Sequence, residues 1–293
     1  MDTEKIIEAG KIAREVVAYA KSIIKSGMKL IEIADSIDAK ILELGGKPAF
    51  PVNLSVDDVA AHSTPAWNDD SVASGLLKVD IGVHVDGWCA DTAFTVDLES
   101  DEENKRLIEA AESALDLALE EVNKKSKLRG IGKKIEEGIK SKGFSPVVNL
   151  SGHSIDRYEL HAGLTIPNVD NGNENEIGEG LFAIEPFTTN GIGKVKDGKP
   201  SGIYHLQSEG NVRDSFAREV LAYIKEEYNT LPFCSRWIYK KFSSRGMLAL
   251  RQMKQSGILY EYPQLIEAEK GRVAQAEHTV LINKDGKKIT TSL

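Results

Sequence analysis

An internal repeat constrains this chain more than any other feature. Residues 52–55 read Val-Asn-Leu-Ser, and the same four residues recur at 148–151. Each copy follows two amphipathic helix patterns and precedes a strand-like run. In each run a glycine stands five residues before a carboxylate, which is Asp80 in the first copy and Glu185 in the second. The sequence therefore predicts two related helix–helix–strand halves, each with an acid at the same place.

The helix patterns occupy residues 6–24 and 30–44 in the first half, and 107–122 and 128–139 in the second. Apolar residues recur there at three- and four-residue steps, which is the period of an amphipathic helix. Glycines follow each pair, at Gly45-Gly46 and at Gly143, and glycine is a common helix stop. We therefore expect one pair of helices in each half.

Residues 79–96 have the pattern of a β-hairpin. Two apolar runs flank Asp86-Gly87, a strong signal for a two-residue turn. With that turn, Asp80 faces Ala93 and Asp91 faces Gly82. Side chains alternate along a strand, so Asp80 and Asp91 become diagonal neighbours on one face, where their carboxylates can converge.

The second half needs a partner strand too, and residues 271–282 are the candidate, with Glu277 matching Asp91. The separation from Glu185 to Glu277 is 92 residues, against 11 from Asp80 to Asp91, so about 81 residues are inserted. Helix patterns at 216–228 and 245–257 lie inside this insertion. We expect an inserted helical subdomain at 205–268, within one catalytic domain spanning 1–293.

Four acids on one side of two hairpins raise each other's pKa unless a cation neutralises them. His153 or His161 would add one imidazole to these oxygen ligands. Such a site suits Mn, Fe(II), Co or Zn, and five ligands are enough for two ions. We expect His84 and His278 to be strand residues without catalytic roles. His205 is a ligand, a pocket residue or a residue of the surface or core, and we favour the surface or core.

Composition excludes several other classes of protein. The chain has 293 residues, a net charge of −8 and two cysteines. Two cysteines cannot build a disulfide framework or a thiolate zinc site. The negative charge argues against nucleic acid as the main ligand. No apolar run approaches the roughly 18 residues of a membrane span, and the charged start lacks a secretory signal, so we expect a cytoplasmic protein without membrane contact.

At this point the residues resemble a known family, the type II methionine aminopeptidases, and within it the short archaeal form. The insertion before the last glutamate favours type II over type I, and the lack of a long N-terminal domain disfavours prolidases and aminopeptidase P. Ala276 stands where the family usually has an aromatic residue. The motifs that carry the resemblance are GGKPAFPVNLSVDDVAAHSTP, VDIGVHVDGWCADTAFTV, VNLSGHSIDRYELHAG, FAIEPF, TLPFCSRW and AQAEHTV.

The resemblance implies a pita-bread α/β (α+β) fold with a pseudo-twofold internal repeat. It also implies two divalent metal ions per chain, with the identity among Co, Mn, Fe(II) and Zn left open. By resemblance, the metal ligands fall on Asp80, Asp91, His153, Glu185 and Glu277, and the two substrate-contacting histidines are His62 and His161.

The implied reaction is removal of the N-terminal methionine from peptides and nascent chains, with a small second residue preferred. A hydroxide bridging the metals would attack the first peptide bond, with Glu185 as proton shuttle. His161 would stabilise the oxyanion and His62 would orient the scissile amide. By resemblance, the methionine side chain would lie among Phe50, Leu160 and Tyr262, with Pro232 nearby.

Two alternatives share the fold: a catalytically weak binding protein, and a proline-directed aminopeptidase that cleaves Xaa-Pro peptides. We expect a monomer. Segment 231–259 holds six Lys and Arg and no acid. It is either a docking surface for ribosomal RNA or a solvated basic face, and salt-dependent co-sedimentation with ribosomes distinguishes the two.

Overall fold

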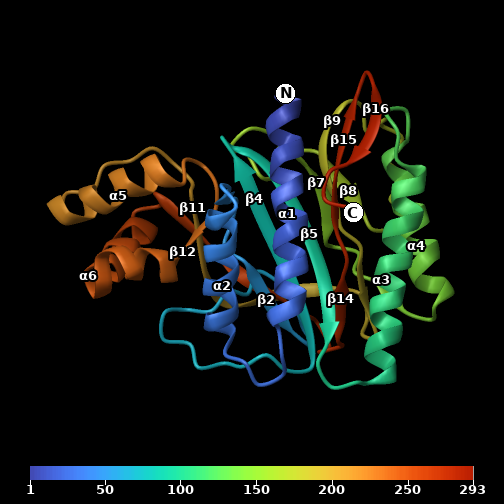
Figure 1. Cartoon of the computed structure of the whole chain (residues 1–293), viewed down its shortest axis with the longest axis horizontal. Helices are drawn as coiled ribbons and strands as arrows, with labels where there is room; N and C mark the ends of the chain where they lie inside the picture. Colours follow the sequence, from blue (N-terminus) through green and yellow to red (C-terminus); the bar gives the residue numbers. More distant parts are fainter. Residues whose placement is uncertain (293) are drawn as a thin grey trace.

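A computed structural model describes residues 1–292, and the helix–helix–strand order appears twice in it (Figure 1), as the repeat predicts. The four expected helices are confirmed. The first half consists of α1 (Thr3–Ile23), α2 (Leu30–Glu43), β1 (Lys47–Pro48), β2 (Asn53–Val56), β3 (Val59–Ala61), β4 (Leu76–Val85) and β5 (Trp88–Asp97). The second half begins with α3 (Glu102–Glu121), α4 (Leu128–Ser141), β6 (Ser145–Pro146), β7 (Ser151–Ile155), β8 (Thr165–Pro167), β9 (Gly180–Ile184) and β10 (Phe187–Thr189).

The remaining elements form an added lobe and then complete the second half. The lobe consists of β11 (Val195–Leu206), α5 (Ser215–Glu227), β12 (Phe233–Cys234), α6 (Ser235–Gln255) and β13 (Leu259–Glu267). The chain then returns to the second half through β14 (Val273–Gln275), β15 (His278–Asn283) and β16 (Gly286–Ile289). The second Val-Asn-Leu-Ser copy differs from the first, because residues 148–150 form a turn before β7 while residues 53–55 are already in β2.

The predicted hairpin is β4–β5, and its register is confirmed. Asp80 pairs with Ala93, and Gly82 pairs with Asp91. The turn residues Asp86 and Gly87 have φ angles of 51° and 83°. Both angles are positive, as a type I′ turn requires, and Gly87 takes its angle without steric cost. The hairpin therefore carries Asp80 and Asp91 on one face.

The second-half partner strand is interrupted, which the sequence did not indicate. The expected strand at 271–282 splits into β14 and β15, with a break at residues 276–277. β9 ends at Ile184, just before Glu185-Pro186, and Pro186 has no N–H to donate to a ladder. The order of strands is β16-β15-β9-β7-β8 in one sheet and β14-β10-β6 in the next. The break leaves two acids at the junction of these sheets.

A seam of hydrogen bonds joins the two halves along β5. Ala93 and Glu277 exchange backbone hydrogen bonds of 3.4 and 3.0 Å. The Thr92 hydroxyl donates to the Glu277 carbonyl at 2.9 Å, and the Thr95 hydroxyl donates to the Gln275 carbonyl at 2.7 Å. These bonds use the backbone groups that the break in the second-half strand leaves unpaired. The seam thereby holds the acids of both halves together.

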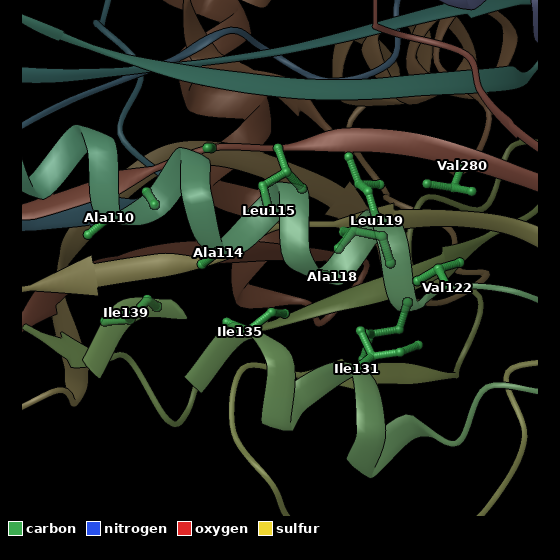
Figure 2. Packing of buried hydrophobic residues seen from close by; sticks show 14 of the residues in the cluster. Ala110, Ala114, Leu115, Ala118, Leu119, Val122, Ile131, Ile135, Ile139 and Val280 are labelled. Atoms are coloured by element: carbon green, nitrogen blue, oxygen red, sulfur yellow. The ribbon is translucent and has the colours of Figure 1, made fainter. Parts of the chain in front are cut away.

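The helices cover the outer faces of these sheets, and each half has its own apolar core. In the second half, Ala114 and Ala118 of α3 face α4, which carries Ile131 and Ile135, while Leu115 and Leu119 point away from α4 (Figure 2). Burying each of these leucine and isoleucine side chains contributes roughly 1.5–3 kcal/mol. With the outer faces occupied in this way, the inner faces remain for a site. Within residues 1–292, no helix is long and apolar enough to cross a membrane.

The added lobe stands to one side of the two halves, with α5 and α6 at its outer surface (Figure 1). It has an apolar core of its own, which includes Val220, Ile238 and Met253. Its sheet has the order β12-β11-β13-β3, and β3 belongs to the first half. The first element of the lobe, β11, begins at Val195, ten residues before the start of the subdomain expected at 205–268. α6 starts ten residues before the expected helix pattern at 245, and it is kinked at Ser243 (φ 52°, ψ −152°).

Candidate metal centre

One cavity of about 380 Å³ lies between the inner faces of the two halves and the lobe. The structure brings every site residue expected from the sequence to its lining. These residues are Phe50, His62, Asp80, Asp91, His153, Leu160, His161, Glu185, Pro232, Tyr262 and Glu277.

The hairpin of the first half and the strand break of the second supply the carboxylates. Asp80 and Asp91 come from β4 and β5, while Glu185 and Glu277 stand at the break. Asp91, His153 and Glu277 are buried, and each offers one ligand atom, all within 4.8 Å of one another. Asp80 and Glu185 line the same cavity beside this group. The arrangement is an oxygen-rich set of donors with one imidazole.

Gln275 is a neighbour of the acids that the sequence analysis did not single out. Its Nε2 lies 3.4 Å from Glu185 Oε2 and 3.4 Å from Glu277 Oε2. It stands two residues before Glu277 on the same chain segment, so the alternation of side chains along a strand could have identified it. The Gln275 amide donates to both carboxylates, and this orients both toward the same cavity.

The four carboxyls are costly to ionise together without a cation. Burial raises the pKa of Asp80 to about 7. Burial also raises the pKa of Asp91, Glu185 and Glu277 well above the usual range, and the charges of neighbouring acids add to the effect. Among the residues described, Asp80 Oδ1, Asp91 Oδ1 and Glu277 Oε1 are buried without a hydrogen-bond partner.

Buried acceptors without partners are costly. Divalent cations accept carboxylate and imidazole ligands and remove this conflict. The residues present therefore fit a metal centre.

His153 is oriented as a ligand would be. Its Nδ1 lies 3.4 Å from the Ser154 carbonyl oxygen, which favours a proton on Nδ1. Its Nε2 lies 3.6 Å from both Asp91 Oδ2 and Glu185 Oε1. Burial lowers its pKa to about 3, so the ring is neutral and Nε2 has a free lone pair. Metal-binding histidines usually have such a hydrogen bond at the ring nitrogen that does not face the metal, which here is Nδ1.

His161 and His62 lie beside this group. The His161 ring is 4.3 Å from the His153 ring, edge to face, and is exposed to the cavity. Desolvation lowers the pKa of His161, and the charge of His205 adds to this. Burial, and then the charge of His161, lower the pKa of His62 to about 4. Both imidazoles are therefore neutral near pH 7, and each keeps one N–H donor.

One part of the cavity lining, here called the apolar end, consists of Phe50, Leu160 and Tyr262. Phe50 and Leu160 are buried there, and Tyr262 is half-buried. Phe50 lies directly on Gly82 of β4, where a Cβ atom would come within 2.3 Å of Phe50 Cε1. Only glycine leaves this space. The Phe50 ring at the apolar end therefore packs directly on the backbone of β4, the strand that carries Asp80.

The other histidines lie outside this cavity. His84 and His278 are strand residues, as expected, and neither lines the cavity, although His278 directly follows Glu277. His205 takes the pocket position that we considered but did not favour, because it is half-buried in the wall of an adjoining cavity of about 570 Å³. Its ring centroid is 5.0 Å from that of Tyr262, a residue that both cavities share. The β11–β13 pairing places it there, and the sequence pattern did not reveal it.

Comparison with known proteins agrees with this arrangement. The profile of Metallopeptidase family M24 matches residues 4–284. A methionine aminopeptidase of Pyrococcus horikoshii is 47% identical over 296 aligned positions, which cover 99% of this chain and 100% of the relative.

Solved structures share the fold. A methionine aminopeptidase of Thermotoga maritima has a TM-score of 0.71 at 22% identity, covering 99% of this chain and 96% of that one. A thermophilic Arx1 has a TM-score of 0.85 at 16% identity, covering 98% and 90%. At these identities the likeness concerns the fold alone.

Proposed function

The chain belongs to the methionine aminopeptidases of metallopeptidase family M24, and we propose that it removes N-terminal methionine at a dinuclear metal centre. The ligands we propose are Asp80, Asp91, His153, Glu185 and Glu277. One observation supports this above all others: three buried carboxylate oxygens without hydrogen-bond partners surround one cavity that also holds a neutral imidazole. Co, Mn, Fe(II) and Zn all accept this donor set.

Within the family, we propose the type II form. The support is the lobe between β10 and β14, which contains two helices and its own apolar core. The lobe also contributes Pro232 and Tyr262 to the cavity lining. In this proposal the lobe forms part of the substrate-binding wall.

The roles of the chain's own residues follow from their places in the cavity. A bound divalent ion acidifies water and polarises a carbonyl oxygen. Glu185, in the cavity wall, accepts a proton from the attacking water on a carboxylate oxygen and passes it to the leaving amine. His161, exposed to the cavity beside His153, donates an N–H to the developing oxyanion. His62, in edge-to-face contact with Tyr262, donates to the scissile amide and orients it.

We propose that the methionine side chain occupies the apolar end among Phe50, Leu160 and Tyr262, with Pro232 nearby. An unbranched thioether fits an apolar, aromatic-lined pocket well. We further propose that the second residue of the substrate must be small. A short series of peptides tests both points, since Met-Ala-Ser should be cleaved and Met-Leu-Ser should not.

The same series separates the alternatives. Release of free methionine from Met-Ala-Ser, with an Ala-Pro peptide left intact, is the expected result. Cleavage of the Ala-Pro peptide with no methionine release would instead indicate a proline-directed peptidase. Binding of Met-Ala-Ser without turnover would indicate a binding protein.

Segment 231–259 has two interpretations from the sequence, a ribosome contact or a solvated basic face, and ion pairs already occupy three of its cations. Arg236 and Lys240 pair with acids of α2, and Lys254 pairs with Glu261. The cations exposed on α6 without an ion pair among the residues described are Lys241, Arg245 and Arg251. We propose that these three make any contact with ribosomal RNA. Absent or salt-insensitive co-sedimentation with ribosomes would exclude it.

We also propose that the chain acts as a monomer. Every site residue expected from the sequence lines the same cavity of this chain, so none of them has to come from a second copy. Sedimentation equilibrium at several protein concentrations tests this, and a concentration-dependent dimer that alone is active would contradict it.

A further inference from the structure

Arg236 is a fully buried cation that the reaction itself does not use. It lies in the first turn of α6, in the lobe, and its side chain is 0% exposed. Removing a guanidinium from water is costly unless its donors are paired. Here the guanidinium makes four hydrogen bonds, to Asp35 Oδ1 (2.9 Å), Asp38 Oδ2 (2.8 Å), Thr64 Oγ1 (3.1 Å) and the Pro65 carbonyl oxygen (2.9 Å).

These four bonds fall into two groups, here called the first and second arms, which end on different parts of the first half. Nε and Nη2 donate to the two aspartates on α2, and this arm fixes where the guanidinium lies. Nη1 alone donates to both Thr64 and Pro65. Thr64 stands two residues after His62, so the second arm ends on the loop that leaves His62.

That loop begins with a backbone conformation that needs support. His62 has a φ of 56°, in the left-handed region that residues other than glycine seldom adopt. Such a conformation persists only where the surroundings over-determine it. Ser63 is held on one side, because its carbonyl accepts from Leu54 N at 2.6 Å and its hydroxyl accepts from Gln264 Nε2 at 3.0 Å. Arg236 holds the next two residues.

We propose that Arg236 is a positioning residue for His62. Its Nη1 arm holds Thr64 and Pro65, and so fixes the direction in which the His62 imidazole enters the cavity. Arg236 also lies four residues after Pro232, which lines the cavity from the lobe. Its bonds therefore also fix the position of this part of the lobe relative to His62. Arg236 itself does not touch the substrate. This inference rests on the role proposed above for His62 in orienting the scissile amide.

A pair of substitutions at Thr64 tests the arm without removing the buried charge. Thr64→Val keeps the shape of the side chain and removes the acceptor, while Thr64→Ser keeps the acceptor. We expect Thr64→Val to lower kcat on Met-Ala-Ser about tenfold with little change in KM, since a small misplacement of an orienting group costs this much. Thr64→Ser should restore kcat, which a role in packing alone would not predict.

A double-mutant cycle with His62→Ala shows whether the effect passes through His62. Thr64→Val should add no further loss to the His62→Ala protein. An equal further loss, or a wild-type kcat for Thr64→Val alone, would overturn the proposal. A wild-type kcat for His62→Ala would overturn instead the role of His62 on which the inference rests. The two failures are therefore distinguishable.

A second variant and a matched control keep the test independent of folding. Arg236→Lys retains one charge for Asp38 but cannot span both arms, so it should lower kcat as Thr64→Val does. Glu32→Gln, at an exposed position of α2 that takes part in neither arm, is the matched control and should leave kcat unchanged. Thermal melts show whether each variant is folded at the assay temperature. Equal kcat losses in Arg236→Lys and Glu32→Gln would contradict the assignment.

Discussion

Glu185 and Glu277 face each other in the gap between the β9–β15 pairing and the β10–β14 pairing, and both pairings have the same register. Ile184 pairs with His278 on one side of the gap, and Phe187 pairs with Gln275 on the other. The two glutamates are therefore directly opposite, whereas Asp80 and Asp91 are diagonal neighbours. In the gap, the Glu277 backbone pairs with Ala93 of the first half instead. The break in the strand thus brings both pairs of acids to one cavity.

Removing the Asp91 charge should empty the proposed centre. Asp91 is buried, and it belongs to the three-residue group whose ligand atoms lie within 4.8 Å of one another. We expect Asp91→Asn to lose bound metal and activity together, as measured by elemental analysis and methionine release. Asp116→Asn, on the exposed face of α3, is the matched control and should retain both. An Asp91→Asn protein that still holds two metals per chain would refute the ligand assignment.

Metal affinity should rise with pH and be accompanied by proton release. Burial raises the pKa of Asp80 to about 7, so the metal-free protein holds a proton there at pH 6 that a cation must displace. His153, with a pKa near 3, contributes no such proton. Each released proton makes affinity rise about tenfold per pH unit below the carboxyl pKa.

Calorimetry in buffers of different ionisation enthalpy measures this release directly. We expect more protons released per metal at pH 6 than at pH 8, and fewer at pH 6 in the Asp80→Asn protein. An affinity that is constant or falls as pH rises from 6 to 8 would show that the acids are ionised without the metal.

Loss of the His161 imidazole should affect the chemical step more than binding. Its place in the cavity beside His153 suits donation to the oxyanion. Removing one such donor usually lowers kcat by about 10²-fold or more. We expect that loss for His161→Ala, with His278→Gln, at a histidine outside the cavity, close to wild type. Steady-state kinetics on Met-Ala-Ser measure both, and turnover of His161→Ala within threefold of wild type would rule out this role.

Filling the space at Gly82 should disturb the apolar end of the cavity. A Cβ there would lie 2.3 Å from Phe50 Cε1, so Gly82→Ala must displace the Phe50 ring. Overpacking of this kind costs about 1–3 kcal/mol. We expect a higher KM for Met-Ala-Ser and a lower melting temperature. Gly130→Ala, in helix α4 with 3.4 Å of clearance from its nearest neighbour, should leave KM unchanged and should not lower the melting temperature. An unchanged KM would mean that methionine does not bind against Phe50.

The sequence predicted the parts of the fold that depend on local patterns. The four helices, the Asp86-Gly87 turn and the Asp80–Ala93 register follow from periodicity and turn chemistry, which act over a few residues. The repeat then indicated that Glu185 and Glu277 form a second pair of acids. Which histidine faces the acids was not decided by spacing, since His153 and His161 both follow the second copy.

Features set by contacts between distant segments could not be predicted. The break at Glu277 exists because Ala93, far away in the sequence, takes over its backbone hydrogen bonds. His205 reaches the adjoining cavity only through the pairing of β11 with β13. The four bonds of Arg236 join three segments that no local pattern relates, so in the sequence it was one cation in a basic run.

The central claim is that these acids hold the metal ions on which methionine release depends. The most direct test is methionine release from Met-Ala-Ser by the chelated protein as Mn, Co or Fe(II) is added back, with bound metal counted at each step. We expect no release without metal, and a return of activity as occupancy rises towards two ions per chain. Unchanged release from metal-free protein, or no release from protein holding two ions, would contradict the account.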